Sequence, residues 1–267
     1  MINNLSLVII TWKNADKLEL TLQSFLDGGL LEMVDDCILV SQETTNKERQ
    51  IAKKFGLSII EHETNLGIEG AWRSGLQHAK HAYCLMMEND CPLIESPHTT
   101  YEQLINAVSL LETGKANMVR LRSMKKPGAK FYNIEKYSRY FEAKDKHYRF
   151  LDKVILFLRR MLRSSKAKRL SGSSVYAIKN PQNRHRNIQK IENNTYLVPS
   201  SILNWTNQSV MIEKQFMVDT LLARVSEYPS SRALNGFQDI ERSLNSRWWR
   251  KQNYMIAVTP GLFTHLE

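Results

Sequence analysis

The 267-residue sequence predicts an α/β fold in which a mostly parallel sheet is flanked by helices on both faces. Two observations support this prediction. Apolar runs of strand length alternate with helix-length stretches through the first 122 residues. The connections between them are short, and glycines follow several of the helical stretches directly. Sheets of this kind bind ligands beyond the carboxyl ends of their strands, so these ends are where functional residues are expected.

Five strands are predicted in the first half. Most are continuous apolar runs, which suits strands that are buried on both faces. They cover residues 5–11, 36–41, 57–60, 82–87 and 116–121. Between them the sequence predicts helices over residues 15–27, 45–55, 67–81 and 99–113.

The regular alternation ends after residue 122. Residues 123–194 are polar, basic and irregular, and are expected to form a partly helical insert. Regular structure then returns as an apolar segment, two helices and a last strand, around residues 196–212, 213–224, 237–249 and 254–259. The chain is therefore expected to form a single domain with a first half (1–122), an insert (123–194) and a second half (195–267).

The composition excludes several classes of protein. With 42% hydrophobic and 24% charged residues, 11 Gly and 7 Pro, the chain is neither collagen-like nor largely disordered. Three cysteines are too few for a disulfide framework and suit a reducing compartment. No apolar run approaches the roughly 20 residues that span a bilayer, and the first residues lack the basic start of a signal peptide. A cytoplasmic location is therefore expected.

The positive charge is concentrated in one segment. The net charge is +10, yet residues 120–170 alone hold 17 Lys and Arg against 4 Asp and Glu. Within them, residues 147–170 combine apolar residues at helical spacing with many basic ones, a pattern typical of a helix on an anionic lipid surface. A basic groove for a phosphorylated acceptor, or a core helix with a solvated tail, would show the same pattern.

Glu88-Asn89-Asp90 follows the fourth predicted strand directly. Carboxylates at positions i and i+2 repel each other, and a divalent cation relieves that repulsion. Hard oxygen ligands of this kind suit Mg²⁺ or Mn²⁺. The same triplet occurs in ordinary polar turns, but its position at a strand exit favours a cation site.

Other polar residues stand at comparable positions. Thr11 leaves the first strand and Glu43 follows the second, where a base or a ribose would be bound. Asn65 and Gly67 allow a tight turn before a helix, and Gly67 permits a nucleotide to approach closely. Arg73, within that helix, is a candidate for contact with a phosphate. Ordinary loop chemistry and a solvated helix charge account for the same residues.

The first half resembles the GT-A glycosyltransferases, especially family 2. Four segments within residues 5–94 carry the resemblance, in order and at the family's spacings: LVIITWKNADKLELTLQSF, ILVSQETTN, NLGIEGAWRSGL and MMENDCPL. The resemblance implies a GT-A fold and a nucleotide-sugar donor, most commonly linked to UDP. It also implies that Glu88 and Asn89 contact this donor, and that Asp90 binds Mn²⁺ or Mg²⁺. Glu88 stands where the family has Asp.

The second half resembles the same family in three segments. GFQDIERSLNSRWWR is similar to the stretch that holds the general base of inverting members, which implies that Asp239 is that base. PGLFTHLE is similar to the segment whose His joins the metal site, which implies that His265 is a ligand. NWTNQSVMIEKQFM is similar to the stretch before the acceptor site, which implies acceptor or diphosphate contacts for Trp205, Thr206 and Asn207. A helix-starting acid, a structural His and polar turn residues are the alternatives.

Together these features predict a metal-dependent, inverting glycosyltransferase. The expected donor is a nucleotide sugar, and the acceptor a glycan or a lipid-linked or lipopolysaccharide saccharide. A lipid-linked acceptor implies peripheral contact with the inner face of a membrane through residues 147–170. A basic nucleic-acid-binding protein and a catalytically inactive transferase-like scaffold are the competing hypotheses. The basic segment has no zinc-finger or helix-turn-helix pattern, so no nucleic-acid partner is expected.

Overall fold

The computed structural model describes residues 1–129, 131–143, 147–231, 233–234 and 236–266. The strands of these residues are β1 (Leu5–Trp12), β2 (Asp36–Gln42), β3 (Ser58–His62), β4 (Tyr83–Glu88), β5 (Met118–Arg122), β6 (Gln189–Lys190), β7 (Tyr196–Pro199), β8 (Val210–Glu213), β9 (Ala233–Leu234), β10 (Phe237–Gln238) and β11 (Met255–Phe263). Within the described chain, β9 and β10 form a small ribbon and the others form one sheet in the order β3-β2-β1-β4-β8-β5-β11-β7-β6.

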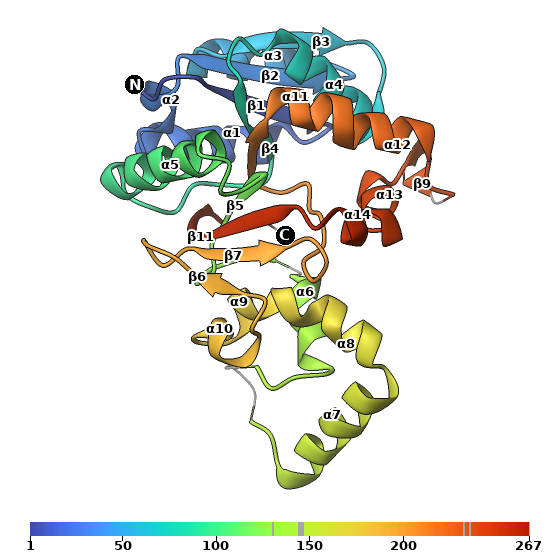
Figure 1. The fold of residues 1–267 in the computed structure, drawn as a ribbon. Helices are drawn as coiled ribbons and strands as arrows, with labels where there is room; N and C mark the ends of the chain where they lie inside the picture. Colours follow the sequence, from blue (N-terminus) through green and yellow to red (C-terminus); the bar gives the residue numbers. More distant parts are fainter. Residues whose placement is uncertain (130, 144–146, 232, 235, 267) are drawn as a thin grey trace.

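Helices connect the strands and cover both faces of the sheet (Figure 1). The first half holds α1 (Ala15–Asp27), α2 (Leu30–Met33), α3 (Asn46–Phe55), α4 (Gly67–His78) and α5 (Pro97–Glu112). Between β5 and β6 lie α6 (Tyr132–Ser138), α7 (Phe150–Leu162), α8 (Ser164–Leu170), η1 (Ser171–Ser173), α9 (Ser174–Ala177) and α10 (Pro181–Arg184). The remainder holds α11 (Lys214–Phe216), the π-helical η2 (Met217–Leu222), α12 (Ala223–Glu227), α13 (Ile240–Leu244) and α14 (Arg247–Gln252).

The predicted α/β fold with a mostly parallel sheet is confirmed. The five strands of the first half are β1 to β5, and the four predicted helices are α1, α3, α4 and α5. β1 pairs in parallel with β2 and with β4, so that Ile9 lies opposite both Leu39 and Met87. β2 pairs in parallel with β3, and β5 with β11.

Strand β8 is the main exception to the parallel arrangement of the sheet. It pairs antiparallel with both β4 and β5, which are therefore not neighbours in the sheet. Its residues Val210, Met211 and Ile212 are fully buried, which a strand achieves only between two neighbours and two covered faces. The apolar segment predicted around residues 196–212 is thus two strands, β7 and β8, that lie in different parts of the sheet.

The helix predicted over residues 237–249 is also different in the structure. Residues 237–238 belong to β10, α13 begins at Ile240 because Asp239 caps it, and α14 follows after a break. The last strand, predicted over residues 254–259, continues to Phe263 and places the PGLF sequence in β11.

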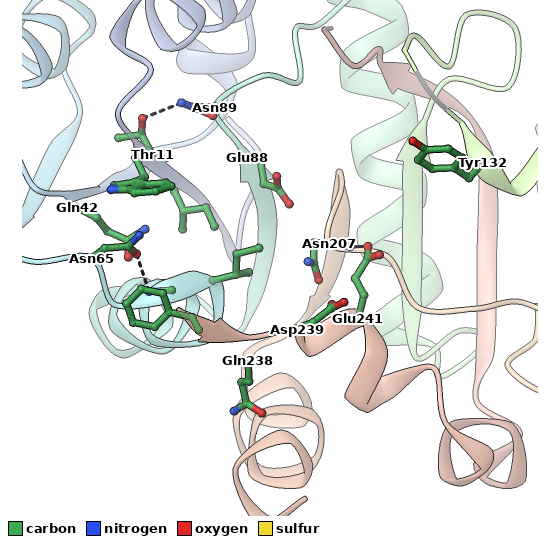
Figure 2. A pocket seen from close by; sticks show the side chains of 15 residues that line it. Thr11, Gln42, Asn65, Glu88, Asn89, Tyr132, Asn207, Gln238, Asp239 and Glu241 are labelled. Carbon is green, nitrogen blue, oxygen red and sulfur yellow. Dashed lines mark hydrogen bonds between the residues drawn. The ribbon is translucent and has the colours of Figure 1, made fainter. Parts of the chain in front are cut away.

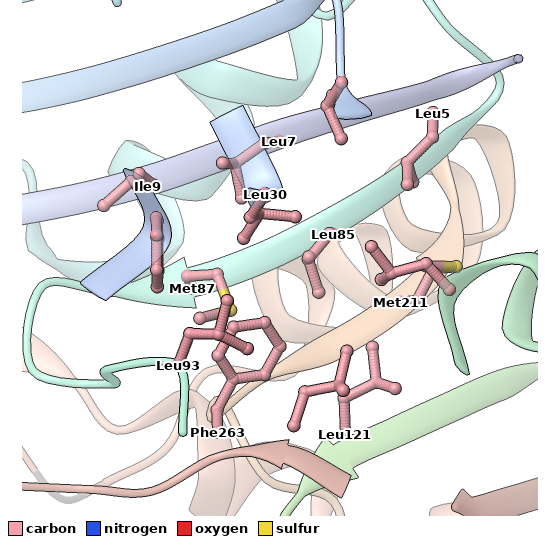
Figure 3. Packing of buried hydrophobic residues seen from close by; sticks show 14 of the residues in the cluster. Leu5, Leu7, Ile9, Leu30, Leu85, Met87, Leu93, Leu121, Met211 and Phe263 are labelled. Carbon is pink, nitrogen blue, oxygen red and sulfur yellow. The ribbon is translucent and has the colours of Figure 1, made fainter. Parts of the chain in front are cut away.

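Two apolar clusters fill the space between the sheet and its helices. Alternate residues of β1 point to opposite faces, so that Leu7 and Ile9 join one cluster and Val8 and Ile10 the other. In the first cluster, strand residues from both halves of the chain meet around Phe263 (Figure 3). Burial on both faces explains why these strands are continuous apolar runs in the sequence.

The segment between β5 and β6 has a small core of its own. Tyr137, Tyr140, Phe141, Ala143, Ala167, Leu170 and Ala177 form it, at the end of the molecule away from the parallel strands (Figure 1). Tyr137 stacks on Phe141, and its hydroxyl lies 3.2 Å from His185 Nε2. None of the helices in the described residues is long and apolar enough to cross a bilayer.

His185 should make the stability of this small core depend on pH. Burial, with a contribution from the charge of Arg184, lowers the pKa of His185 to about 4 from 6.5. The unfolded chain therefore binds more protons between these values, so stability is complete above about pH 6.5 and is lost as the pH falls towards 4. At about 1.4 kcal/mol per pKa unit the full shift corresponds to roughly 3 kcal/mol, and the partial exposure of His185 reduces the expected loss to the order of 2 kcal/mol. Hydrogen exchange of residues 131–185, measured across this range, should show the decrease.

Replacing His185 with Gln should remove that pH dependence. The same replacement at His147, which is exposed, should leave it intact. An equal slope in the His185→Gln protein would show that another group is responsible.

Candidate functional site

A cavity of about 490 Å³ opens at the carboxyl ends of β1, β2 and β4. The second half of the chain closes its other side with β10 and the start of α13 (Figure 2). The residues that line it are Ile10, Thr11, Trp12, Gln42, Asn65, Gly67, Ile68, Glu88, Asn89, Tyr132, Asn207, Phe237, Gln238, Asp239 and Glu241. Seven of them were predicted as site residues from the sequence, namely Thr11, Asn65, Gly67, Glu88, Asn89, Asn207 and Asp239.

Side-chain amides hold the strand exits in place. Asn89 Nδ2 donates a hydrogen bond to Thr11 Oγ1 at 2.8 Å, which joins the ends of β4 and β1. Gln42 Oε1 accepts from the Leu66 amide at 2.8 Å and so ties the end of β2 to the turn before α4. These bonds fix the wall of the cavity before any ligand is bound.

The turn before α4 requires glycine at position 67. Asn65 Oδ1 accepts from the Gly67 amide at 2.8 Å, and Gly67 has a φ of +70°. A Cβ atom at this position would lie 2.6 Å from Cγ of Phe237. The backbone of α4 and the ring of Phe237 therefore approach each other as closely as they do only because residue 67 has no side chain.

Two of the residues expected to bind the nucleotide lie outside this lining. Glu43 has a φ of +52° and pairs with Lys13 at 2.7 Å. Arg73 Nη2 contacts Glu69 Oε1 at 3.2 Å and Ser226 Oγ at 3.0 Å. Gln42, the last residue of β2, lines the cavity instead.

Asp90 and His265 lie side by side, as the sequence suggested, but beyond the lining of this cavity. Oδ2 of Asp90 is 3.3 Å from Nε2 of His265, and each side chain is about one-fifth exposed, at 18% and 19%. Backbone bonds hold the two segments together, from Leu266 N to Asp90 O at 2.9 Å and from Thr264 N to Pro92 O at 3.0 Å. Burial opposes the ionisation of Asp90, but the hydrogen bond and charge of His265 bring its pKa below the ordinary value.

These two side chains fit a divalent cation as an incomplete donor set. His265 Nδ1 is buried and has no hydrogen-bond partner in the described part of the chain. A carboxylate suits Mn²⁺ and Mg²⁺, and an imidazole is a common ligand of divalent transition metals. Across residues 1–129, 131–143, 147–231, 233–234 and 236–266, no group of three or more His, Cys, Asp and Glu side chains is placed to hold a metal. A cation here would therefore need oxygen atoms from a ligand or water to complete its coordination.

Carboxyl groups cluster beside this pair. Burial raises the pKa of Glu88 to about 8, and the charges of Asp90 and Glu241 add to the effect, while Arg122 opposes it. A bound cation would relieve the repulsion among these groups and favour the ionised form of Glu88.

A second cavity, of about 400 Å³, adjoins the first and shares Tyr132 and Glu241 with it. Its lining includes Arg122 and Lys136, together with the predicted residues Trp205, Thr206 and His265. The indole N–H of Trp205 donates to Asn207 Oδ1 at 2.8 Å, and the ring packs edge-on against Trp249. Trp205 therefore positions Asn207, which reaches the first cavity.

Two carboxylates stand at the border between the cavities. Asp239 lines the first cavity, and its Oδ1 accepts from the Arg242 amide at 3.2 Å as the N-cap of α13. Glu241 lines both cavities and accepts from the Asn207 amide at 3.2 Å. Burial raises the pKa of Glu241. Figure 2 shows both side chains beside Asn207, at the opposite side of the cavity from Thr11 and Asn89.

Sequence reasoning missed Glu241, although it is part of the segment that singled out Asp239. The signal was its place in that segment, two positions after Asp239, whose charge contributes to the raised pKa of Glu241 in the structure. Trp12, Gln42, Tyr132 and Phe237 were missed as well. None of these four belongs to a residue type that marks a functional site by itself.

Comparisons with known proteins agree with this architecture. The model of glycosyl transferase family 2 matches residues 6–170, which is more than half of the chain. The solved structure of the mannosyltransferase PcManGT from Pyrobaculum calidifontis, in complex with GDP-Man and Mn²⁺, has a TM-score of 0.53 at 12% identity. The structure of S. aureus TarS 1–349 has a TM-score of 0.51 at 13% identity. At such low identity, likeness to these structures supports the fold alone.

The chain covers only part of these relatives. The alignments include 99% and 98% of this chain, but 56% of PcManGT and 60% of the TarS chain. The sequence thus spans less than two-thirds of the length of either structure. Comparison with curated proteins gave no match.

Replacing Gly67 with Ala should destabilise the protein more than the same change at Gly56. Both glycines have a φ near +70°, but an added Cβ meets Phe237 at position 67 and nothing within 4 Å at position 56. Gly56→Ala should cost about 1 kcal/mol for the backbone conformation alone. Gly67→Ala should cost a further 1–3 kcal/mol, roughly the range for overpacking. Urea unfolding of the two variants would measure the difference, and equal losses would contradict a tight contact at Phe237.

Proposed function

The chain belongs to glycosyl transferase family 2. We propose that it transfers a sugar from a nucleotide-sugar donor to a hydroxyl group of an acceptor. The reaction would use a divalent metal and would invert the configuration at the anomeric carbon. One observation carries the proposal. Two neighbouring cavities share the half-buried Glu241, and the carboxyl-rich exit of β4 lies beside them. This arrangement would accommodate a donor and an acceptor side by side, with Asp239 and Glu241 as the candidate proton acceptors.

The 490 Å³ cavity is the proposed donor site. Its volume lies within the roughly 300–1,000 Å³ typical of sites for small molecules. Trp12 and Phe237 offer aromatic surfaces for a base, and Gln42 and Asn65 offer amide groups at the strand exits. We propose UDP as the nucleotide, as the commonest in the family. GDP is the alternative, since PcManGT was solved with GDP-Man.

Asp90 and His265 are the residues that would hold Mn²⁺ or Mg²⁺. A metal bound there would neutralise the negative charge that develops on the leaving diphosphate. Bonds within the chain would hold these two ligands in place. The backbone bonds between residues 90–92 and 264–266 keep Asp90 and His265 together, and the side chain of Asn89 holds the exit of β4 against Thr11.

Asp239 is the proposed general base. A carboxylate on the acceptor side of the donor can remove the proton from the attacking hydroxyl as the bond to the anomeric carbon forms. A single displacement from that side inverts the configuration. Glu241 is the second candidate, because it lines both cavities whereas Asp239 lines only the first.

The 400 Å³ cavity is the proposed acceptor site. Arg122 and Lys136 make it cationic, which suits an acceptor that carries phosphate or carboxylate groups, such as a lipopolysaccharide saccharide. Thr206 would contact the sugar rings, and Trp205, which is 2% exposed, would act by holding Asn207 in place. A lipid-linked acceptor would require the protein to work at the inner face of a membrane.

Replacing Asp90 with Ala should abolish Mn²⁺-dependent binding of nucleoside diphosphate, because one of two protein donors is lost. Isothermal titration with UDP and with GDP, in the presence and absence of Mn²⁺, would measure this. The exposed Asp27, changed to Ala, serves as the matched control and should bind normally. Unchanged Mn²⁺-dependent binding by a folded Asp90→Ala protein would place the metal elsewhere.

Replacing Asp239 with Asn should preserve binding of the donor and lower the rate of transfer by about 10²–10⁴-fold, the range for general-base catalysis. Glu241→Gln is the matched comparison. A panel of nucleotide sugars and saccharide acceptors would provide the assay, and NMR of the product would give its anomeric configuration. A near-normal rate for Asp239→Asn with a large loss for Glu241→Gln would assign the base to Glu241, and a retained configuration would exclude this mechanism.

The same binding measurements separate the competing hypotheses. Metal-dependent nucleotide binding without turnover of any donor would support a catalytically inactive scaffold. Salt-sensitive binding of duplex DNA without nucleotide binding would support a nucleic-acid-binding protein.

A further inference from the structure

Helix α7 presents its apolar side chains to solvent. Phe150 and Leu162 are 78% and 84% exposed, and six other apolar residues of the helix are also exposed: Leu151, Val154, Ile155, Phe157, Leu158 and Met161. Leu156 is the one buried residue of this helix. The helix forms the far end of the molecule, away from the sheet (Figure 1).

The side of α7 that faces the protein is held mainly by polar contacts. Arg160 Nη1 donates to the Tyr140 carbonyl at 2.7 Å, and Lys153 Nζ lies 3.6 Å from a carboxylate oxygen of Glu142. Only Leu156 provides a buried apolar contact on that side. An amphipathic helix ordinarily buries its apolar face against the core. In α7 this arrangement is reversed, and the apolar face is left for a partner outside the chain.

Exposed basic side chains accompany this apolar face along the same segment. The exposed Lys and Arg residues of the 147–170 segment are Arg149, Lys153, Arg159, Arg163, Lys166, Lys168 and Arg169. Asp152 is the one acidic residue in the same segment, and it caps the start of α7. A partner that covers the apolar face must therefore offer an apolar interior with a negatively charged rim.

We propose that α7 is the membrane-docking element of this protein and lies flat in the headgroup region of an anionic bilayer. Its 13 residues are too few to span a bilayer, which requires about 20. The apolar face would enter the acyl chains, and the basic residues of α7 and α8 would contact the lipid phosphates. A second copy of the chain fits less well, because two basic rims would then face each other. The proposal concerns a surface remote from the cavities and does not depend on the transfer reaction.

Vesicle sedimentation with the full chain tests this proposal. The unmodified protein should bind vesicles of phosphatidylcholine mixed with an equal amount of phosphatidylglycerol, and should bind vesicles of phosphatidylcholine alone much more weakly. High salt should reduce the binding to the mixed vesicles, because lipid charge acts only within a Debye length.

Two triple variants separate the apolar and the basic contributions. Replacing Leu151, Leu158 and Leu162 with Gln should reduce binding to the mixed vesicles by roughly tenfold or more, and so should replacing Arg163, Lys166 and Arg169 with Gln. All six side chains are exposed, so the fold should be preserved. Arg159 and Arg160 are left unchanged because both donate to backbone carbonyls next to α6.

Matched controls lie on other surfaces of the protein. Leu20, Leu26 and Ile105 are exposed apolar residues, and Lys53, Lys115 and Lys251 are exposed basic ones. The corresponding Gln variants should bind vesicles normally. All variants should keep Mn²⁺-dependent UDP or GDP binding if the proposed function is correct, so failure of that function would be seen separately from failure of docking.

Three outcomes would overturn the proposal. One is absence of vesicle binding by the unmodified protein. Another is equal loss of binding in the control variants. The third is a dimer, detected by analytical ultracentrifugation, that dissociates when Leu151, Leu158 and Leu162 are replaced, because the apolar face would then belong to a contact between copies.

Discussion

The insertion of β8 between β4 and β5 is the constraint on which the site depends. Met211 lies opposite Leu85 on one side and Val119 on the other, so a strand from the second half completes the sheet of the first. The residues just before β8 include Asn207, which is thereby brought to the cavity at the exit of β4. β11 likewise pairs with β5 and leads directly to His265. These two contributions of the second half therefore follow from its strands being part of one sheet, whereas β10 and α13 reach the cavity from outside that sheet.

Strand β5 also supplies the charge that balances the buried carboxyl groups. Arg120 and Arg122 are 1% and 5% exposed. The charge of Arg122 favours ionisation of Glu88, and the charge of Arg120 favours ionisation of Glu241. Burial and mutual repulsion both oppose the ionisation of these two carboxyl groups. The arginines of β5 therefore offset part of that penalty for Glu88, at the end of β4, and for Glu241, in α13.

Much of the first half could be predicted from local sequence, because strands buried on both faces are continuous apolar runs and polar residues begin where they end. Thr11, Glu88 and Asn89 were found in this way. The position of β8 could not, since Val210–Glu213 has the same apolar character whichever strands it pairs with. The contact expected of Glu43 is not seen, because Glu43 lies just beyond the end of β2, has a positive φ and pairs with Lys13, so that Gln42 lines the cavity. Periodicity also identified the apolar face of α7, but it carries no information about whether that face meets the protein or the solvent.

His265 follows directly after β11, so its position depends on a few backbone hydrogen bonds. Bonds from Ile94 N to Leu262 O, from Thr264 N to Pro92 O and from Leu266 N to Asp90 O join residues 90–94 to residues 262–266. Local opening of these three bonds would separate the side chains of Asp90 and His265, even with the rest of the sheet intact. A ligand that contacts both Asp90 and His265 would make such opening rarer by mass action. The protection of the amides of residues 262–266 against hydrogen exchange would then increase with occupancy of the site. These amides would report on ligand binding although they bond to the chain and not to the ligand.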